Sequence, residues 1–264
     1  MHGVGNKFVI YDLRSSSLNV NELNSKLLNN KLEDTDYDQK IILLNAKESD
    51  VFMKIYNIDG SEASACGNAT RCVAYIISKE KNIDSISIET PNRILTASKI
   101  TNSIYSVNMG TALLSNADIP LTKNCDPQNI KLLDEHKFGT GFALNVGNPH
   151  IVFFVKNINN ISLKQDVAFL EKHTIFKEGV NINIAQIISN NQIQLKTWER
   201  GAGETKACGT GACATAYAAF HQRLITNQVS ISMPGGTLEI SISDDNQIFM
   251  SGETSLDSRE ELEL

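Results

Sequence analysis

Gly201-Ala-Gly-Glu-Thr-Lys-Ala-Cys-Gly-Thr210 nearly repeats an earlier stretch of the same chain, Asp59-Gly-Ser-Glu-Ala-Ser-Ala-Cys-Gly-Asn68. The two cysteines, Cys66 and Cys208, are 142 positions apart, and the stretches quoted in this paragraph contain ten identities at this one offset, without a gap. The recurrences outside these stretches are Val4-Gly5-Asn6 with Val146-Gly147-Asn148, Lys54 with Lys196, and Ala74-Tyr75 with Ala216-Tyr217. Similarity at one fixed period marks a repeated structural unit. The chain is therefore predicted to be a duplicated half, with one thiol in each copy.

The length and the repeat together divide the chain into two lobes. A sequence of 264 residues fits two units of about 130 residues, within the usual domain range. We expect an N-terminal lobe over residues 1–112 and a C-terminal lobe over residues 113–251, each with one of the repeated cysteines. Residues 252–264 form a predicted tail, whose return to the N-terminal lobe is left open.

Short runs of β-branched and alternating apolar residues dominate the chain and predict strands. These runs are 8–11, 41–44, 51–56, 85–89, 103–108, 151–155, 180–184, 193–198, 229–233 and 238–242. Helical patterns follow the cysteines at about 66–80 and 208–222, and others lie at 19–30 and 162–172. The two helices after the cysteines carry few charges, which is typical of a helix buried in its domain. The predicted fold class is α+β, with two pseudo-symmetric strand-rich lobes, each a curled sheet around a central helix.

Composition argues against several classes of partner. The net charge of −6 comes without a basic patch, so nucleic acid is not an expected ligand. No apolar run approaches the roughly 20 residues that span a bilayer, and the N-terminus lacks the layout of a signal peptide. We therefore expect a cytoplasmic protein with no membrane partner. Five cysteines are an odd number, which favours reduced thiols. Their spacing, with no histidine nearby, does not suit zinc, and no metal is expected.

Each repeated cysteine is expected at the N-terminus of a helix. The helix dipole and unpaired backbone N–H groups there favour a thiolate and lower the thiol pKa. The following glycine lets a substrate carboxylate approach the same N–H groups. The alternative is that Cys66 and Cys208 are buried and inert, as free cysteines often are. Their duplication with a glycine and an upstream glutamate favours a functional role. Cys72 and Cys213 are interpreted as packing residues, and Cys125 has no repeat partner.

Two thiols suit inversion of the α-carbon of an amino acid. One thiolate removes the α-proton on one face and the other thiol protonates the opposite face, with roles exchanged in the reverse direction. The α-proton is very weakly acidic, so the enolate-like charge needs donors that are already in place. Two helix N-termini directed at the α-carboxylate would provide them.

Further candidates are polar residues at predicted strand ends and turns. Singly, each is more often a turn or cap residue than a ligand, but several are related by the repeat offset. The candidates are the repeat pairs Asn57 with Glu199 and Gln39 with Asn181, together with Arg200, Asn148 and His150. Glu199 offers an acceptor for an ammonium group, and Arg200 offers a forked donor for a carboxylate.

With these residues in place, the chain resembles diaminopimelate epimerase over nearly its whole length. The matching motifs are Met1-His-Gly-Val-Gly-Asn6, Asn57-Ile-Asp-Gly-Ser-Glu62, Cys66-Gly-Asn-Ala-Thr-Arg-Cys72, Met109-Gly110, Gly147-Asn-Pro-His150, Val180-Asn181, Trp198-Glu-Arg-Gly-Ala-Gly-Glu-Thr205, Ala207-Cys-Gly-Thr-Gly-Ala-Cys213 and Pro234-Gly-Gly236. The resemblance implies an enzyme without a cofactor that interconverts LL- and meso-diaminopimelate, on the route to lysine and peptidoglycan. It also implies a homodimer.

The resemblance carries roles onto individual residues of this chain. The catalytic cysteine pair falls on Cys66 and Cys208, and the supporting base and ammonium contacts fall on His150 and Glu199. Recognition of the distal carboxylate and amine falls on Asn6, Asn57, Asn148, Asn181 and Arg200. A substrate-binding role for Gln39 rests on the pair Asp38-Gln39 and on its repeat partner Asn181. Backbone donors to the reacting carboxylate fall on Gly67, Asn68, Gly209 and Thr210.

Two other functions remain open at this point. A related two-cysteine racemase, acting on proline or hydroxyproline, would keep the fold and change the substrate. Arg200 and the asparagines argue against it, because a second amino-acid head needs polar ligands that a proline ring does not. A binding module that grips an amino acid without turnover would not need both cysteines.

Overall fold

The computed structural model describes residues 1–30, 37–63, 66–132 and 135–261. Its contacts divide the chain into two compact units. The first comprises Met1–Val107 with Gly252–Leu264, and the second comprises Asn108–Ser251. The chain leaves the first unit within strand β8 (Ile104–Thr111) and returns to it within strand β16 (Gln247–Glu253).

The first unit is one mixed sheet with a helix against it. Its strands follow the order β1-β2-β3-β4-β6-β7-β8, and β5 pairs with β4. The pairs β2/β3 and β4/β6 are parallel, whereas the other neighbours are antiparallel. The strands besides β8 are β1 (His2–Gly3), β2 (Asn6–Asp12), β3 (Gln39–Leu44), β4 (Val51–Asn57), β5 (Glu62–Ala63), β6 (Ser85–Glu89) and β7 (Ile94–Lys99). The unit's α-helices are α1 (Val20–Asn30) and α2 (Gly67–Lys81).

The second unit repeats this order with every strand number raised by eight. Its sheet runs β9-β10-β11-β12-β14-β15-β16, with β13 on β12, and β10/β11 and β12/β14 are its parallel pairs. The strands besides β16 are β9 (Phe142–Asn145), β10 (Pro149–Phe154), β11 (Asn181–Ser189), β12 (Gln192–Glu199), β13 (Gly203–Thr205), β14 (Gln228–Met233) and β15 (Gly236–Ile242). Its α-helices are α3 (Glu135–Phe138) and α4 (Gly209–His221). The predicted duplication and fold class are confirmed, and every predicted strand falls on an observed one.

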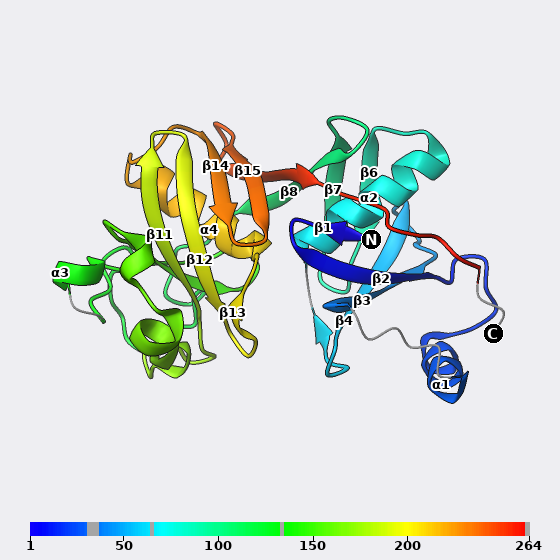
Figure 1. Cartoon of the computed structure of the whole chain (residues 1–264), viewed down its shortest axis with the longest axis horizontal. Helices are drawn as coiled ribbons and strands as arrows, with labels where there is room; N and C mark the ends of the chain where they lie inside the picture. Colours follow the sequence, from blue (N-terminus) through cyan, green and yellow to red (C-terminus); the bar gives the residue numbers. More distant parts are fainter. Residues whose placement is uncertain (31–36, 64–65, 133–134, 262–264) are drawn as a thin grey trace. The chain divides into compact units, whose positions relative to one another are not determined.

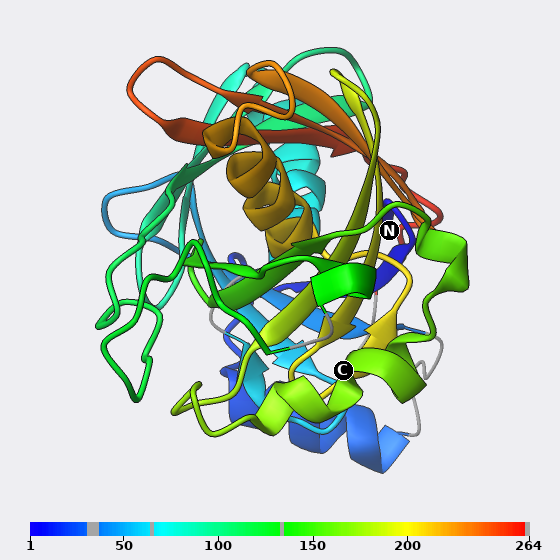
Figure 2. The same cartoon turned by 90° about the vertical axis from the view of Figure 1, so that its left-hand side faces the viewer.

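The helix that follows each cysteine is the centre of its unit. Helix α2 lies across its own sheet and contacts β1, β6 and β7 (Figure 1). Helix α4 lies within the curl of the second sheet and contacts β9, β10, β11, β12, β14 and β15 (Figure 2). Its alanines, from Ala212 to Ala219, are fully buried. Alanine has the highest helix propensity and the smallest side chain, so the sheet can close around the helix on several sides.

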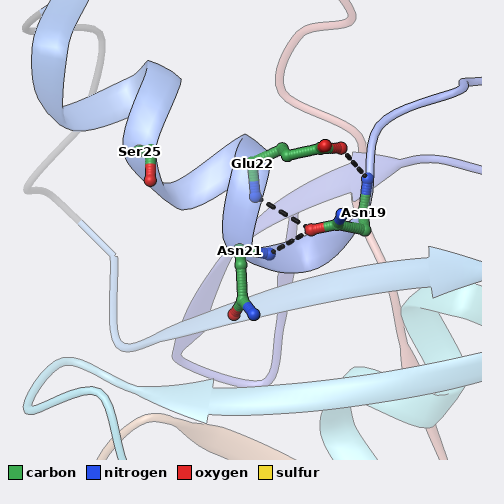
Figure 3. A pocket seen from close by; sticks show the side chains of 4 residues that line it. All are labelled: Asn19, Asn21, Glu22 and Ser25. Carbon is green, nitrogen blue, oxygen red and sulfur yellow. Dashed lines mark hydrogen bonds between the residues drawn. The ribbon is translucent and has the colours of Figure 1, made fainter.

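Helix α1 begins with a capping box. The Asn19 side chain accepts hydrogen bonds from the backbone N–H groups of Asn21 and Glu22, both at 3.0 Å, and the Glu22 carboxylate accepts from the Asn19 N–H at 2.8 Å (Figure 3). These reciprocal bonds satisfy the first orphan donors of the helix. Asn19, Asn21, Glu22 and Ser25 also line a surface pocket. Three of these residues form the cap of α1, so their presence is explained by the structure of the helix and not by a ligand.

The predicted helix over 162–172 is not a continuous α-helix. The chain there forms a π-turn over Leu163–Val167 and a 3₁₀-turn over Ala168–Lys172, after a short 3₁₀-turn over Ile158–Asn160. The apolar spacing is helical, because Leu163, Val167 and Leu170 are buried. The end of the segment is held instead by Glu171, whose carbonyl accepts from Val180 N–H at 3.1 Å. Tertiary bonds at this end favour two short turns over one helix.

Candidate active site

Both repeated cysteines occupy the position that the sequence predicts. Cys66 is the N-cap of α2 with φ −146° and ψ 107°, and Cys208 is the N-cap of α4 with φ −131° and ψ 110°. The two backbones are therefore nearly identical at this point. Cys66 is half-buried, and Cys208 is buried. Each unit thus presents one thiol at the positive end of its central helix.

The surroundings of Cys208 hold its sulfur in the thiol form. The Sγ accepts a hydrogen bond from Gly211 N–H at 3.3 Å and lies 3.5 Å from Thr210 Oγ1. Burial is the largest influence and raises the Cys208 pKa well above its usual value, and the Glu199 charge raises it further. The expectation of a lowered pKa is wrong for Cys208. Desolvation disfavours the thiolate more than the bonds from the helix N-terminus favour it.

Glu199 is the last residue of β12 and forms the acidic partner of this thiol. Its carboxylate accepts a hydrogen bond from Thr205 Oγ1 at 2.6 Å, and it also hydrogen-bonds Cys208. Burial raises the Glu199 pKa despite these bonds. Its repeat partner Asn57, the last residue of β4, carries no charge. The two thiols therefore belong to half-sites of different electrostatics.

His150 lies in the interior of the second unit and is fully buried. Its Nε2 is 2.9 Å from Asn148 Oδ1, and its Nδ1 is 3.0 Å from Asn183 Nδ2. Burial, followed by the charge of Arg200, lowers the His150 pKa to about 3. The ring is therefore neutral at pH 7. Asn183 was not among the predicted site residues, although its position two residues after Asn181 places it on the same face of β11.

The turn after β12 is fixed by residues from two neighbouring segments. Asn181 accepts from Arg200 N–H at 2.9 Å and donates to the Pro149 carbonyl at 2.8 Å. Arg200 donates through Nη1 to the Glu178 carbonyl at 2.7 Å. Arg200 also lines a pocket whose other members are Glu171, Lys172, Phe176, Lys177, Glu178 and Gly179. Asn181 therefore places the backbone of Arg200, and the basic side chain reaches a surface depression.

Glu171 is a further residue of this turn that the sequence analysis missed. Its carboxylate accepts from Trp198 Nε1 at 2.7 Å and from Gly201 N–H at 3.0 Å. The bond from Trp198 is the main reason that the Glu171 pKa is lowered. Glu171 therefore ties the residues on either side of Arg200 to the 3₁₀-turn over Ala168–Lys172. No motif signals this role, because Glu171 lies about thirty positions before the turn.

In the first unit, the predicted polar residues form two hydrogen-bonded groups. Asn68, in the first turn of α2, donates to Asn6 Oδ1 and accepts from Arg71 Nη2 at 2.9 Å. Gln39 donates to Asn57 Oδ1 at 2.9 Å, since the two face each other across β3 and β4. The structure thus brings Asn6 to the start of α2, and Gln39 to Asn57.

The remaining predicted residues supply backbone donors. Gly67 and Asn68 open α2, and Gly209 and Thr210 open α4. The first N–H groups of a helix have no partner within it, so they can bind an anion. Gly67 and Asn68 are buried, whereas Gly209 and Thr210 are half-buried.

Within the described ranges, no group of three or more His, Cys, Asp or Glu side chains is placed to hold a metal ion. No helix in the same ranges is both long and apolar enough to cross a membrane.

Comparisons with known proteins identify a family for this chain. A family model described as Diaminopimelate epimerase matches residues 1–114 and 142–256. A diaminopimelate epimerase of Wolbachia sp. subsp. Brugia malayi (strain TRS) is 43% identical over 255 residues, covering 96% of this chain and 95% of the relative. One from Pelagibacter ubique (strain HTCC1062) is 40% identical over 262 residues, covering 97% and 94%.

Solved structures share the fold at low identity. A phenazine biosynthesis protein of the PhzF family from Enterococcus faecalis aligns with a TM-score of 0.70 at 15% identity, covering 96% of this chain and 91% of that chain. A probable proline racemase from Agrobacterium radiobacter K84 aligns with a TM-score of 0.58 at 13% identity, covering 96% and 88%. At such identities the likeness extends to the fold alone.

Proposed function

The chain belongs to the diaminopimelate epimerase family, and from that premise we propose that it interconverts LL- and meso-diaminopimelate with two cysteines and no cofactor. The observation that carries the mechanism is the duplicated N-cap cysteine, Cys66 on α2 and Cys208 on α4. A single N-cap cysteine is compatible with an inert structural thiol. A second one at the repeat-related position, with the same backbone conformation, supplies the paired acid and base that inversion requires.

In the proposed reaction, one sulfur takes the α-proton as a thiolate while the other gives its proton to the opposite face. The C–H electron pair remains on the α-carbon and its carboxylate until the new C–H bond forms, so protons and charge balance. In the described state, burial and Glu199 favour the protonated form of Cys208, which is the donor form. In the turnover that starts from this state, Cys66 is therefore the base and Cys208 is the acid. In the reverse reaction, Cys208 is the base and Cys66 is the acid.

The proposed binding of the reacting carboxylate uses the helix starts. Gly67 and Asn68 of α2, and Gly209 and Thr210 of α4, offer N–H groups for the carboxylate, whose charge grows as the α-proton leaves. These donors belong to rigid helices, so little reorganisation accompanies the reaction. Glu199 would complete the site as the ammonium contact, whereas the buried neutral ring of His150, with a pKa of about 3, would position its neighbours and not act as a base.

The distal amino-acid head would be recognised by polar side chains at the strand ends. Arg200 offers a planar pair of donors for the distal carboxylate. The amide side chains provide acceptors for the distal ammonium and further donors; they are Asn6, Gln39, Asn57, Asn148 and Asn181. A proline substrate has no second head, which is why diaminopimelate fits this set better than a cyclic imino acid.

The test is turnover of LL-diaminopimelate in deuterium oxide without added cofactor. We expect meso-diaminopimelate to form and deuterium to enter the α-position. Deuterium exchange into proline or hydroxyproline instead would favour the related racemases. Binding of diaminopimelate by calorimetry without any exchange would favour a binding module and contradict the mechanism.

The family relationship places this activity in lysine biosynthesis. We propose further that the protein acts in the cytoplasm, and that it forms the homodimer that the resemblance implies. Sedimentation of the purified chain at micromolar concentration tests the dimer, and a monomer that retains full activity would contradict it.

A further inference from the structure

A buried polar layer lies beneath the start of α4 and is absent from the repeat-related place in the first unit. We define the polar layer as His150, Asn183 and Thr197, all buried on β10, β11 and β12. Asn183 and Thr197 face each other across β11 and β12. The residues at the repeat offset are Phe8, Ile41 and Ile55, all buried and apolar, and Ile41 and Ile55 also face each other.

The hydrogen bonds of Asn183 fix which of its amide atoms faces His150. Its Nδ2 lies 3.3 Å from the Ile151 carbonyl, which can only accept. Its Oδ1 accepts from Thr197 Oγ1 at 3.1 Å. The group that reaches His150 Nδ1 at 3.0 Å is therefore an N–H donor. His150 Nδ1 must be a bare acceptor, so the ring proton sits on Nε2 and is donated to Asn148 Oδ1.

The same asparagine also bounds the first turn of α4. A Cβ on Gly211 would lie 2.6 Å from Asn183 Oδ1 and 3.1 Å from Thr197 Oγ1. Only a residue without a Cβ lets the helix approach the layer so closely. Gly211 is also the residue whose N–H donates to Cys208 Sγ. Asn183 thus touches the His150 ring on one side and the turn that holds the Cys208 sulfur on the other.

We propose that Asn183 is a positioning residue that holds His150 as the neutral Nε2–H tautomer and seats the first turn of α4 at Cys208. Its effect on turnover rests on the proposed function, whereas the tautomer is a property of the folded chain and can be measured without substrate. The layer adds to the difference between the two halves, because the repeat-related positions of the first unit hold buried apolar residues.

The test combines ring ¹⁵N NMR of His150 with steady-state kinetics. In the unmodified protein at pH 7, we expect the shifts of a neutral ring protonated at Nε2, assigned by their loss in His150→Gln. Asn183→Asp should place a proton on Nδ1, because a carboxylate accepts where the amide donated. Asn183→Leu should abolish the single tautomer. In both variants we expect kcat to fall about 10- to 100-fold, as for other residues that orient a functional histidine, with KM changed less than about threefold.

Matched controls come from the same strand. The Gln186 side chain accepts from Ile158 N–H at 2.9 Å and lies outside the polar layer. Gln186→Glu and Gln186→Leu make the same chemical changes and should leave the His150 shifts and kcat unaltered. Retention of the Nε2–H signature in both folded Asn183 variants would overturn the proposal.

The unmodified protein gives a second, independent outcome. A His150 ring protonated at Nδ1 would overturn the proposal even if neither Asn183 variant folds. If the unmodified protein shows the Nε2–H ring but no turnover of diaminopimelate, the proposed function fails while the tautomer assignment stands.

Discussion

Adding one methyl group at Gly211 tests whether the seat of α4 sets the position of the Cys208 thiol. In Gly211→Ala, the new Cβ would lie 2.6 Å from Asn183 Oδ1, 3.1 Å from Thr197 Oγ1 and 3.2 Å from Cys208 Cβ. Ordinary contact begins near 3.4 Å, so either the start of α4 or the hydrogen-bonded Asn183 side chain must shift by most of an ångström. Overpacking of this kind costs about 1–3 kcal/mol, against about 1 kcal/mol gained from replacing glycine by alanine in a helix.

The expected stability loss is therefore small, about 0–2 kcal/mol, and the expected loss of activity is large. A shift near 1 Å at a reacting group can lower the rate about 100-fold. Urea unfolding gives the first quantity, and turnover of LL-diaminopimelate gives the second. Asn183→Ala removes the atom in closest contact with the new methyl group. The stability loss of the double variant Gly211→Ala/Asn183→Ala should therefore be smaller than the sum of the two single losses, by more than about 0.5 kcal/mol. Normal kcat and additive stabilities would refute the close packing described for this turn.

Three further predictions address the thiols, the histidine and the arginine turn. Cys66→Ala and Cys208→Ala should each abolish epimerisation with an unchanged circular dichroism spectrum, whereas Cys125→Ser should remain active; near-normal turnover in either alanine variant would exclude a two-thiol mechanism. His150 has a folded pKa of about 3 against an ordinary 6.5, so its stabilising effect is complete above pH 6.5 and is lost as the pH falls toward 3. Between pH 7 and pH 5 the free energy of unfolding should therefore fall by about 2 kcal/mol because of His150. In urea unfolding, His150→Gln should lose less stability over this pH range, by about that amount; an equal loss would mean the ring is not held neutral. Glu171→Ala should raise KM for diaminopimelate several-fold with a smaller change in kcat, because it frees the turn that carries the proposed carboxylate ligand, and an unchanged KM would remove Glu171 from that role.

The main architecture could be predicted because the duplication is visible in the sequence. The offset between Cys66 and Cys208 pairs the halves, and glycine after each cysteine predicts a close helix start. The same offset places Gln39 and Asn181 at the first residues of β3 and β11. At these points the local residue pattern and the repeat offset predict the same structure, so the prediction is well determined.

The features that were missed depend on contacts between distant segments. The pKa of Cys208 is set by burial within a sheet that the sequence does not display, so the local dipole argument gave the wrong sign. Asn183 follows Asn181 in an alternating strand, and the sequence marks it only as another polar position. Its role depends on contacts with His150 of β10 and Gly211 of α4, which lie far from it in the sequence. Strand β7 has only two buried residues, Leu95 and Ala97, and exposed residues on either side of them, so its sequence pattern is too short to predict a strand.

A duplicated fold supplies two equivalent thiols, yet the proposed reaction needs them to be unlike at any instant. One must hold a proton while the other lacks it, and two identical environments would not assign the proton to either. In this chain the halves share the backbone of the cysteine cap but differ in what lies next to it. Glu199 stands where the first unit has Asn57, and it favours the protonated form of Cys208. A buried histidine and its hydrogen-bonded neighbours stand where the first unit has aromatic and aliphatic side chains. In the proposed reaction, the shared geometry provides the pair of sulfurs, and the residues next to Cys208 favour it as the one that begins as the acid.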